Sequence, residues 1–296
     1  MAAGIGPDRA LGAAASAIRH HYDVADGFYR LWLDPSMTYS CALWAEVGES
    51  LEEAQLRKTD YHLAQARVAA GSRVLDVGCG WGGLLRRATE TNGARGAVGL
   101  TLSRHQAEWI RGRGWAGCEV REESWSDHSP EERYDAVVSV GAFEHFARVG
   151  LPPAQRVAGY RPFFERCAGW LGPGGVLSLQ TIVTGGGQLD PRALADAGFL
   201  AREIFPESGI PTMTDIRLAS KGLFETVQLR LDGAHYARTC AVWRERLADA
   251  REAAVAVAGE ATVRRYERYL DACVRLFERE QADLARLTLR ATATGA

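Results

Sequence analysis

The segment RVLDVGCGWGG, residues 73–83, decides the fold of this chain. It begins as a short β-branched run and ends in glycines, and the next residues, LLRRATE, have the composition of a helix. Asp76 lies in the strand-like part, and the glycines at 78, 80 and 82 allow the backbone to turn tightly and to approach a ligand. The segment therefore predicts the first strand, loop and helix of a nucleotide-binding βαβ unit.

The glycine spacing distinguishes between two kinds of nucleotide site. A dinucleotide site has the spacing G-x-G-x-x-G and an acidic residue at the end of the second strand. Here the spacing is G-x-G-x-G, and the second predicted strand, residues 96–102, ends in Thr101 and Leu102. The loop resembles motif I of S-adenosylmethionine (SAM) methyltransferases, which packs against the amino-acid and ribose portions of a ligand without phosphates. A tight turn of no function is the alternative.

The rest of the chain predicts a single α/β domain. Further β-type runs at 118–125 and 176–183, and one that begins at Tyr134, alternate with helical segments. This alternation is typical of a parallel, doubly wound sheet. We expect an N-terminal helical cap (1–69), a Rossmann-like core (70–184 and 223–233), a substrate lid rich in glycine and proline (185–222) and C-terminal helices (234–296).

Composition excludes several classes of protein. With 35 basic and 37 acidic residues, the net charge of −2 offers no electrostatic footprint for nucleic acid, and at most a peripheral membrane contact is expected. Lys58 and Lys221 are the only lysines, and the six cysteines have no metal-type spacing. No apolar run approaches the roughly 18 residues that span a bilayer. We expect a soluble, cytoplasmic protein with free thiols and no metal site.

Seven blocks of sequence, in order along residues 20–280, resemble the cyclopropane fatty acid synthases and mycolic acid cyclopropane synthases. The blocks are HYDVADGFYRLWLDPSMTYSCALW (21–44), VLDVGCGWGGLLRRA, VGLTLSRHQ, ESWSD, VSVGAFEHF, IFPESGIPT and HYARTCAVWRERL. The resemblance implies a class I SAM methyltransferase fold, with a mostly parallel sheet of seven strands. It also implies an enzyme that transfers a methyl or methylene group from SAM to a carbon of an unsaturated, hydrophobic acceptor.

The resemblance assigns the SAM contacts residue by residue. Tyr39 and Ser40 would hold the methionine portion together with the glycine loop, Gln106 would bind the ribose, and Trp125 would border the adenine. A buried core tryptophan is the alternative interpretation of Trp125. The expected cofactor-binding residues are Tyr39, Ser40, Asp76, Gly78, Gly80, Gly82, Thr101, Leu102, Gln106, Trp125 and Ser126.

The resemblance also implies a catalytic base. In the family a bound bicarbonate removes a proton from the transferred methyl group and is held by a Cys, a Glu, a His, a backbone carbonyl and a Tyr. The matching positions are Cys41, Glu144, Gln180, Ile182 and Tyr236. Gln180 replaces the histidine; its amide can donate a hydrogen bond but cannot carry a charge. Bicarbonate would then bind more weakly, or Glu144 would act alone.

Each candidate has a structural alternative. Cys41 could be a small buried hydrophobic residue, Glu144 and His145 could form a capping pair, and Tyr236 could pack with Trp243, seven residues further along one helix face. His145 is the second candidate for the general base, after Glu144.

The acceptor is expected to be hydrophobic, either an acyl chain or a small molecule. Its predicted contacts are Tyr22, Phe28, Phe205 and Met213, from the N-terminal cap and the lid. Three functions stay open: a cyclopropane synthase, a C- or N-methyltransferase of a small molecule in specialised metabolism, and a SAM-binding protein without activity. Retention of Cys41 and Glu144 disfavours the third.

Overall fold

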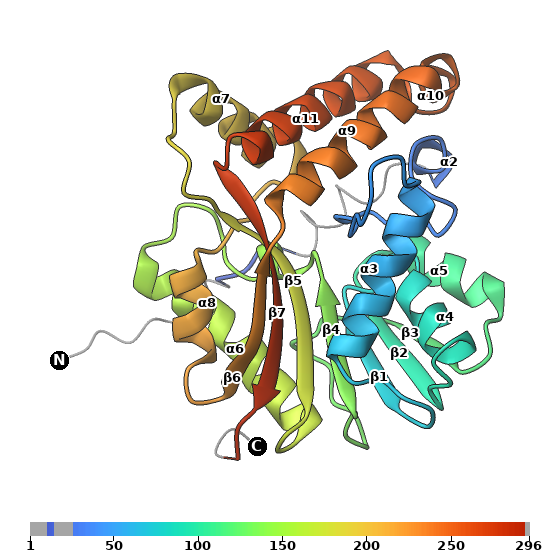
Figure 1. Ribbon diagram of the computed structural model, residues 1–296, viewed down its shortest axis with the longest axis vertical. Coiled ribbons are helices and arrows are strands. Elements are labelled where there is room, and N and C mark those ends of the chain that lie inside the picture. The colour runs from blue at the N-terminus through green and yellow to red at the C-terminus, as the bar shows by residue number, and fades with distance from the viewer. Residues whose placement is uncertain (1–10, 15–25, 294–296) are drawn as a thin grey trace.

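A single mixed sheet organises the molecule, and the glycine loop lies at one edge of it (Figure 1). The structure, a computed structural model, describes residues 11–14 and 26–293. Over these residues the sheet has seven strands in the order β3-β2-β1-β4-β5-β7-β6. The predicted mostly parallel, seven-stranded α/β fold is confirmed. The strands are β1 (Arg73–Val77), β2 (Gly96–Thr101), β3 (Cys118–Glu122), β4 (Ala136–Val140), β5 (Val176–Thr184), β6 (Phe224–Leu231) and β7 (Ala282–Ala291).

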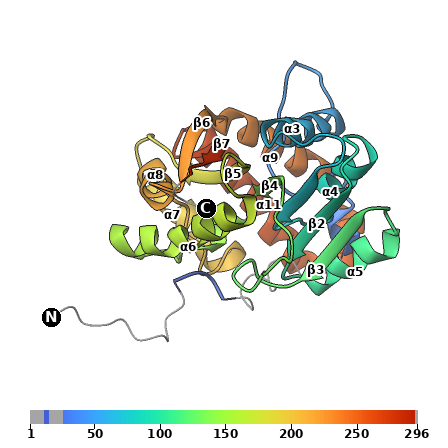
Figure 2. The same cartoon turned by 90° about the horizontal axis from the view of Figure 1, so that it is seen from below.

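Helices cover both faces of the sheet, which is why its central strands are continuously apolar. On one face Leu75 and Val77 pack with Phe163 and Phe164 of α6 (Pro153–Leu171), beside α8 (Met213–Ser220). On the other face Val74 packs against α3 (Leu51–Gln65), α4 (Gly83–Glu90) and α5 (Arg104–Arg113). Figure 2 shows the two groups of helices on opposite sides of the strands.

Besides the two hydrophobic clusters on the faces of the sheet, a third hydrophobic cluster lies beyond the end of the sheet. It contains α2 (Asp26–Tyr29), α7 (Pro191–Phe199), α9 (Gly233–Asp249), α10 (Arg251–Ala258) and α11 (Glu260–Glu278), most of which lie at the top of Figure 1. None of the helices within 26–293 is long and apolar enough to cross a membrane.

The prediction that residues 234–296 are entirely helical is wrong for β7. Residues 282–291 form a strand between β5 and β6 and run antiparallel to both. The segment ADLARLTLRA is rich in alanine, leucine and arginine, which favour helices. Pairing along both edges of β7 and burial on both of its faces override this local preference.

The segment 185–222 is more regular than the expected lid. It contains α7, a π-helical turn (Leu200–Ile204) and α8. Asp196 of α7 accepts two hydrogen bonds from Arg275 of α11, at 2.9 and 3.0 Å, and α8 packs on α6. The glycines and prolines therefore separate short helices that are docked on different parts of the molecule.

Candidate active site

A cavity of about 500 Å³ opens at the carboxyl ends of β1, β2 and β4. It is lined by the glycine loop, the ends of β2 and β4, residues 36–40 and residues 123–126. Residues 11–13, which were not among the predicted site residues, also reach it. The structure places ten of the eleven expected cofactor residues in its wall: Tyr39, Ser40, Asp76, Gly78, Gly80, Thr101, Leu102, Gln106, Trp125 and Ser126.

The glycine loop is shaped by sterics. Gly78 has φ +82°, and a Cβ there would lie 2.5 Å from the Cβ of Ala142, so only glycine fits. Gly80 has φ +53° and lines the cavity, and a Cβ on it would meet no protein atom within 4 Å. Gly82, the remaining expected residue, lies behind the wall, where a Cβ would meet Ile110 at 2.9 Å. Gly80 thus leaves room for a ligand, whereas Gly78 and Gly82 allow the loop to pack closely against Ala142 and Ile110.

Hydrogen bonds at the end of β2 orient Gln106 toward a ligand. The Thr101 hydroxyl donates to Gln106 Oε1 at 2.7 Å and accepts from the backbone N–H of Ser103 at 3.1 Å. Since the amide oxygen is occupied, the Gln106 amino group remains the donor in the cavity wall. This arrangement suits the recognition of ribose hydroxyls.

The opposite end of the cavity contains a buried amine beside a buried carboxyl group. Lys58 on α3 donates to Ser40 Oγ at 2.9 Å, and burial lowers the Lys58 pKa to about 8. Burial raises the pKa of Asp76 to about 7, and the ammonium of Lys58 opposes that rise. A cation and an anion side by side complement the zwitterionic end of an amino acid, such as the methionine portion of SAM.

Lys58 is a site residue that the sequence analysis missed. It lies on the buried face of α3 with Leu51, Gln55 and His62, at helical spacing. A lysine on an inward helix face in a chain with only two lysines was the available signal.

Glu144 presents a carboxylate oxygen that lacks a partner. The residue lies in a short 3₁₀ turn (Phe143–His145) after β4 and is 8% exposed. Its Oε1 accepts from the backbone N–H of Ile182 at 2.7 Å, whereas its Oε2 has no hydrogen bond within the described part of the chain. Burial raises the Glu144 pKa, and the bond from Ile182 opposes the rise. This oxygen can accept a proton.

Gln180 on β5 is fixed by two donors. Its Oε1 accepts from Arg286 Nε at 2.8 Å and lies 3.1 Å from His62 Nε2. Arg286 also contacts Cys41, whose Sγ lies 3.5 Å from one guanidinium nitrogen. Gln180 and Cys41 are thus joined through a buried arginine that the sequence analysis did not single out.

Cys41 and Tyr236 are protonated donors rather than nucleophiles. Burial raises the pKa of Cys41 to about 12, and its thiol donates to the carbonyl of Ala42 at 3.2 Å. Burial also raises the pKa of Tyr236, with smaller contributions from nearby groups that include Cys41 and Glu144. The Tyr236 ring meets Trp243 edge-on, with centroids 6.3 Å apart, and stacks on Phe277 at 4.6 Å, so its packing interpretation is confirmed, while its site role stays a prediction.

His145 and the adjacent Glu144 bond to different parts of the molecule. Its Nδ1 bonds to Ser208 Oγ at 2.7 Å, and its side chain lines the cofactor cavity. Burial lowers the His145 pKa to about 4, which makes the ring neutral near pH 7. Glu144, in contrast, bonds to β5 and is not among the residues that line this cavity, so the choice between the two as the base stays a prediction.

The expected substrate residues do not form one surface. Phe28 is fully buried with Tyr29 and Tyr266, and Phe205 packs on Tyr269 at 5.7 Å. Met213 instead packs with the α6 side of the core, because α8 docks there. Tyr22 lies outside the described residues.

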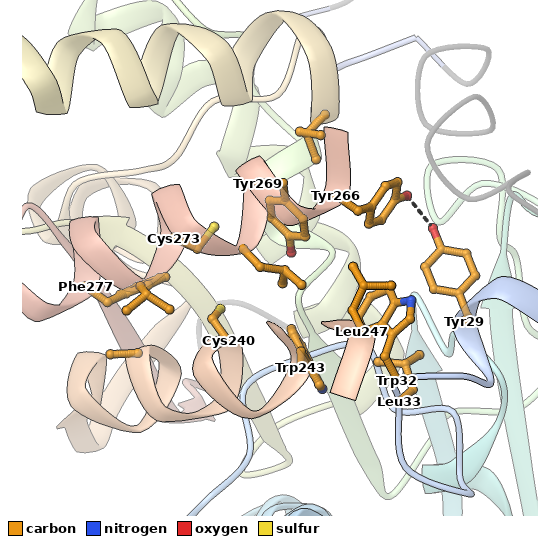
Figure 3. Packing of buried hydrophobic residues seen from close by; sticks show 14 of the residues in the cluster. Tyr29, Trp32, Leu33, Cys240, Trp243, Leu247, Tyr266, Tyr269, Cys273 and Phe277 are labelled. Atoms are coloured by element: carbon orange, nitrogen blue, oxygen red, sulfur yellow. Dashed lines mark hydrogen bonds between the residues drawn. The ribbon is translucent and has the colours of Figure 1, made fainter. Parts of the chain in front are cut away.

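An aromatic wall of buried side chains lies among α2, α9 and α11 (Figure 3). The hydroxyls of Tyr29 and Tyr266 are 2.9 Å apart, and Trp32 packs on Trp243 with centroids at 5.7 Å. Tyr39 links this wall to the cavity, since its ring lies 5.4 Å from those of Tyr29, Trp32 and Trp243. The electron-rich cluster therefore reaches the cavity through Tyr39.

Comparisons with known proteins agree with this geometry. The family model for mycolic acid cyclopropane synthetase matches residues 10–287. Cyclopropane mycolic acid synthase MmaA2 of Mycobacterium tuberculosis is 36% identical over 92% of this chain and 96% of its own. The UmaA SAM-dependent methyltransferase of the same species is 33% identical over 90% of this chain and 94% of its own.

Solved structures extend the comparison. The structure of MmaA2 from M. tuberculosis matches with a TM-score of 0.86 at 33% identity, over 95% of this chain and all of that one. Mycolic acid cyclopropane synthase CmaA1 complexed with SAH and CTAB gives 0.83 at 30% identity, over 95% and 99% of the two chains. The chain therefore belongs to the mycolic acid cyclopropane synthetase family and is a SAM-dependent methyltransferase of the cyclopropane-synthase type.

Proposed function

We propose that this enzyme converts a carbon–carbon double bond of an unsaturated acyl chain into a cyclopropane ring, with Glu144 at the centre of the proton transfer. The observation that carries the proposal is the Oε2 of Glu144, which is buried and without a partner among the described residues, while its other oxygen is held by Ile182. A desolvated carboxylate whose orientation is fixed is suited to accept a proton.

The residues of the cavity fit SAM at three points. Gly80 leaves space for it, Gln106 offers a donor to the ribose, and Lys58 with Asp76 complements the amino-acid end. When bound, SAM would supply an electrophilic methyl group to one alkene carbon, with cleavage of its C–S bond, S-adenosylhomocysteine as the leaving group and a positive charge left on the neighbouring carbon. Loss of a proton from that methyl closes the three-membered ring, so the acceptor gains one CH₂ overall.

The chain's own side chains protect such a cation. The wall of Tyr29, Trp32, Trp243 and Tyr266 is at most 2% exposed, which excludes water as a competing nucleophile. The faces of aromatic rings also attract a positive charge. The thiol of Cys41 stays protonated because burial raises its pKa to about 12, so it does not capture the cation.

Bicarbonate fits the polar side of this site. The amino group of Gln180 and the hydroxyl of Tyr236 are donors for an oxyanion, and Glu144 Oε2 can accept from a hydroxyl of the anion. When bound, bicarbonate supplies a base beside the acceptor. We propose that Gln180 preserves this site in a neutral form.

An acyl acceptor is supported by the relatives and by the aromatic wall. MmaA2 is named as acting on mycolic acids, and CmaA1 binds CTAB in its crystal structure. A small-molecule methyltransferase is the alternative that the Gln180 substitution favours, because methylation without ring closure does not need the family's base site.

The test supplies the purified enzyme with SAM that carries a CD₃ group and with oleoyl- or palmitoleoyl-phospholipid vesicles. Ring closure removes one hydrogen of the transferred methyl, so a cyclopropane retains two deuteriums and a simple methylation product retains three. We expect two by mass spectrometry. Three deuteriums would refute ring closure and show simple methylation of the acyl chain.

SAM-site binding should depend on pH through Asp76 and Lys58. Asp76, with a pKa of about 7, must be ionised to hold an ammonium, and Lys58, with a pKa of about 8, must be protonated to hold a carboxylate. Affinity for SAH is therefore expected to peak between these values and to fall by up to about tenfold per pH unit on either side.

Calorimetric titrations of SAH over a pH series check this dependence. Asp76→Asn should remove the fall in SAH affinity at acid pH (the acid limb), and Lys58→Met should remove the fall at alkaline pH (the alkaline limb). Lys221→Met, which changes the chain's other lysine at an exposed position, is the matched control and should leave both limbs intact. An alkaline limb that survives in Lys58→Met would contradict the assignment.

A further inference from the structure

Arg286 of β7 lies beneath the proposed anion site and is fully buried. Its Nε donates to Gln180 Oε1 at 2.8 Å, one terminal nitrogen donates to Asp232, and the other donates to the carbonyl of Ala42 at 3.0 Å. We propose that Arg286 is a positioning residue that fixes Gln180 as a donor to the oxyanion beside Glu144 and supplies the positive charge that Gln180 lacks. This inference rests on the proposed function.

The orientation of Gln180 follows from its partners. An arginine nitrogen can only donate, so the atom that faces it must be the amide oxygen. His62 Nε2 lies 3.1 Å from the same oxygen and must also donate, which leaves Nδ1 to accept from Ser178 Oγ at 2.8 Å. Because Arg286 and His62 both donate to the amide oxygen, the amino group of Gln180 points away from these two residues.

The strands β5 and β7 bring Arg286, Gln180 and the anchor of Glu144 to one part of the sheet. Arg286 is the residue directly opposite Gln180 in the antiparallel register of β5 and β7. The backbone N–H that binds Glu144 belongs to Ile182, two residues further along β5. The donor that Arg286 orients therefore lies on the same strand as the group that holds the Glu144 carboxylate.

The charges around Asp232 leave an excess of one positive charge. Arg230 also donates to Asp232, through two nitrogens at 3.1 Å, so two guanidinium groups share one carboxylate. The side chain of Arg230 is 38% exposed and that of Arg286 is fully buried. A buried charge acts strongly on its surroundings. The positive charge of Arg286 would therefore offset the repulsion that an oxyanion meets from the Glu144 carboxylate.

The inference is tested by bicarbonate binding to the SAH-saturated protein, which needs no acceptor. The linewidth of ¹³C-labelled bicarbonate, followed by NMR as protein is added, yields a dissociation constant. Arg286→Gln should weaken binding by about tenfold or more, as expected for the loss of a charged partner. Arg286→Lys, which keeps the charge but not the planar fork, should lose less.

Two comparisons separate positioning from general damage. Arg230→Gln removes the other guanidinium from Asp232 without touching Gln180. It cancels the excess charge but keeps the bond that positions Gln180, and it should weaken bicarbonate binding less than Arg286→Gln does. SAH affinity should be unchanged in every variant. Because Asp232 keeps Arg230 as a partner, we expect Arg286→Gln to fold; if it does not, Arg286→Lys decides the matter.

A double variant that restores bicarbonate binding is the most decisive test. Gln180→His alone should not strengthen binding, since an imidazole beside Arg286 is held neutral and must accept from it. The double variant Gln180→His with Arg286→Gln should regain the wild-type constant, because the imidazole can then carry the charge. Wild-type binding in Arg286→Gln, or no bicarbonate binding by the wild type, would overturn the inference. The deuterium count tests ring formation separately.

Discussion

Glu144→Gln is expected to lower turnover by about a thousandfold, within the range found when a general base is removed. Glutamine has nearly the shape of glutamate, and its Oε1 can still accept from the N–H of Ile182. The change therefore removes the proton acceptor at Oε2 while the geometry remains. Single-turnover assays with labelled SAM measure the rate, and calorimetry with SAH should show unchanged affinity.

His145→Gln is the matched control for this variant. His145 is the adjacent residue, its ring bonds to Ser208, and it lines the cofactor cavity. We expect it to alter SAH affinity more than the rate of the chemical step. If His145→Gln stopped turnover and Glu144→Gln did not, the assignment of the base would be reversed.

Gly78→Ala should be the most damaging change to the cofactor site. A Cβ at this position would lie 2.5 Å from the Cβ of Ala142, and the φ of +82° is strained for alanine. We expect a loss of about 2–3 kcal/mol in the free energy of unfolding, from strain and overpacking together, and no measurable SAH binding.

Gly80→Ala separates the two effects. Its φ of +53° costs alanine only about 1 kcal/mol, and the added methyl group meets no protein atom within 4 Å. This variant should remain folded and should lose SAH affinity because the methyl group occupies ligand space. Denaturant unfolding and calorimetry on both variants check the contrast; equal stability losses would contradict it.

The sequence was most informative where backbone sterics and chemistry coincide. Asp76 and the glycines at 78 and 80 predicted both the first βαβ unit and the position of the cavity, because few other segments require such spacing. The S-x-x-E spacing of Ser50 and Glu53 likewise marks the start of α3, where the structure forms a capping box. These features are local, so a single sequence can reveal them.

Features that depend on distant contacts were not predictable. The strand β7 has helical composition, and only its pairing with β5 and β6 makes it a strand. Arg286 resembled an ordinary surface arginine because nothing near it in sequence indicates that Gln180 lies opposite. Lys58 was likewise noticed for its rarity and not for its burial. Each of these residues gains its role from a partner more than one hundred positions away or from tertiary burial.

The position of β7 has a consequence for biosynthesis. This strand is the last element of the described residues, but it fills the gap between β5 and β6, and β6 has no other neighbour in the described sheet. Until residues 282–291 have been synthesised and have paired, both of those strands expose an unpaired edge, and Gln180 lacks the guanidinium that orients it. We therefore expect the reaction centre to form only when β7 docks.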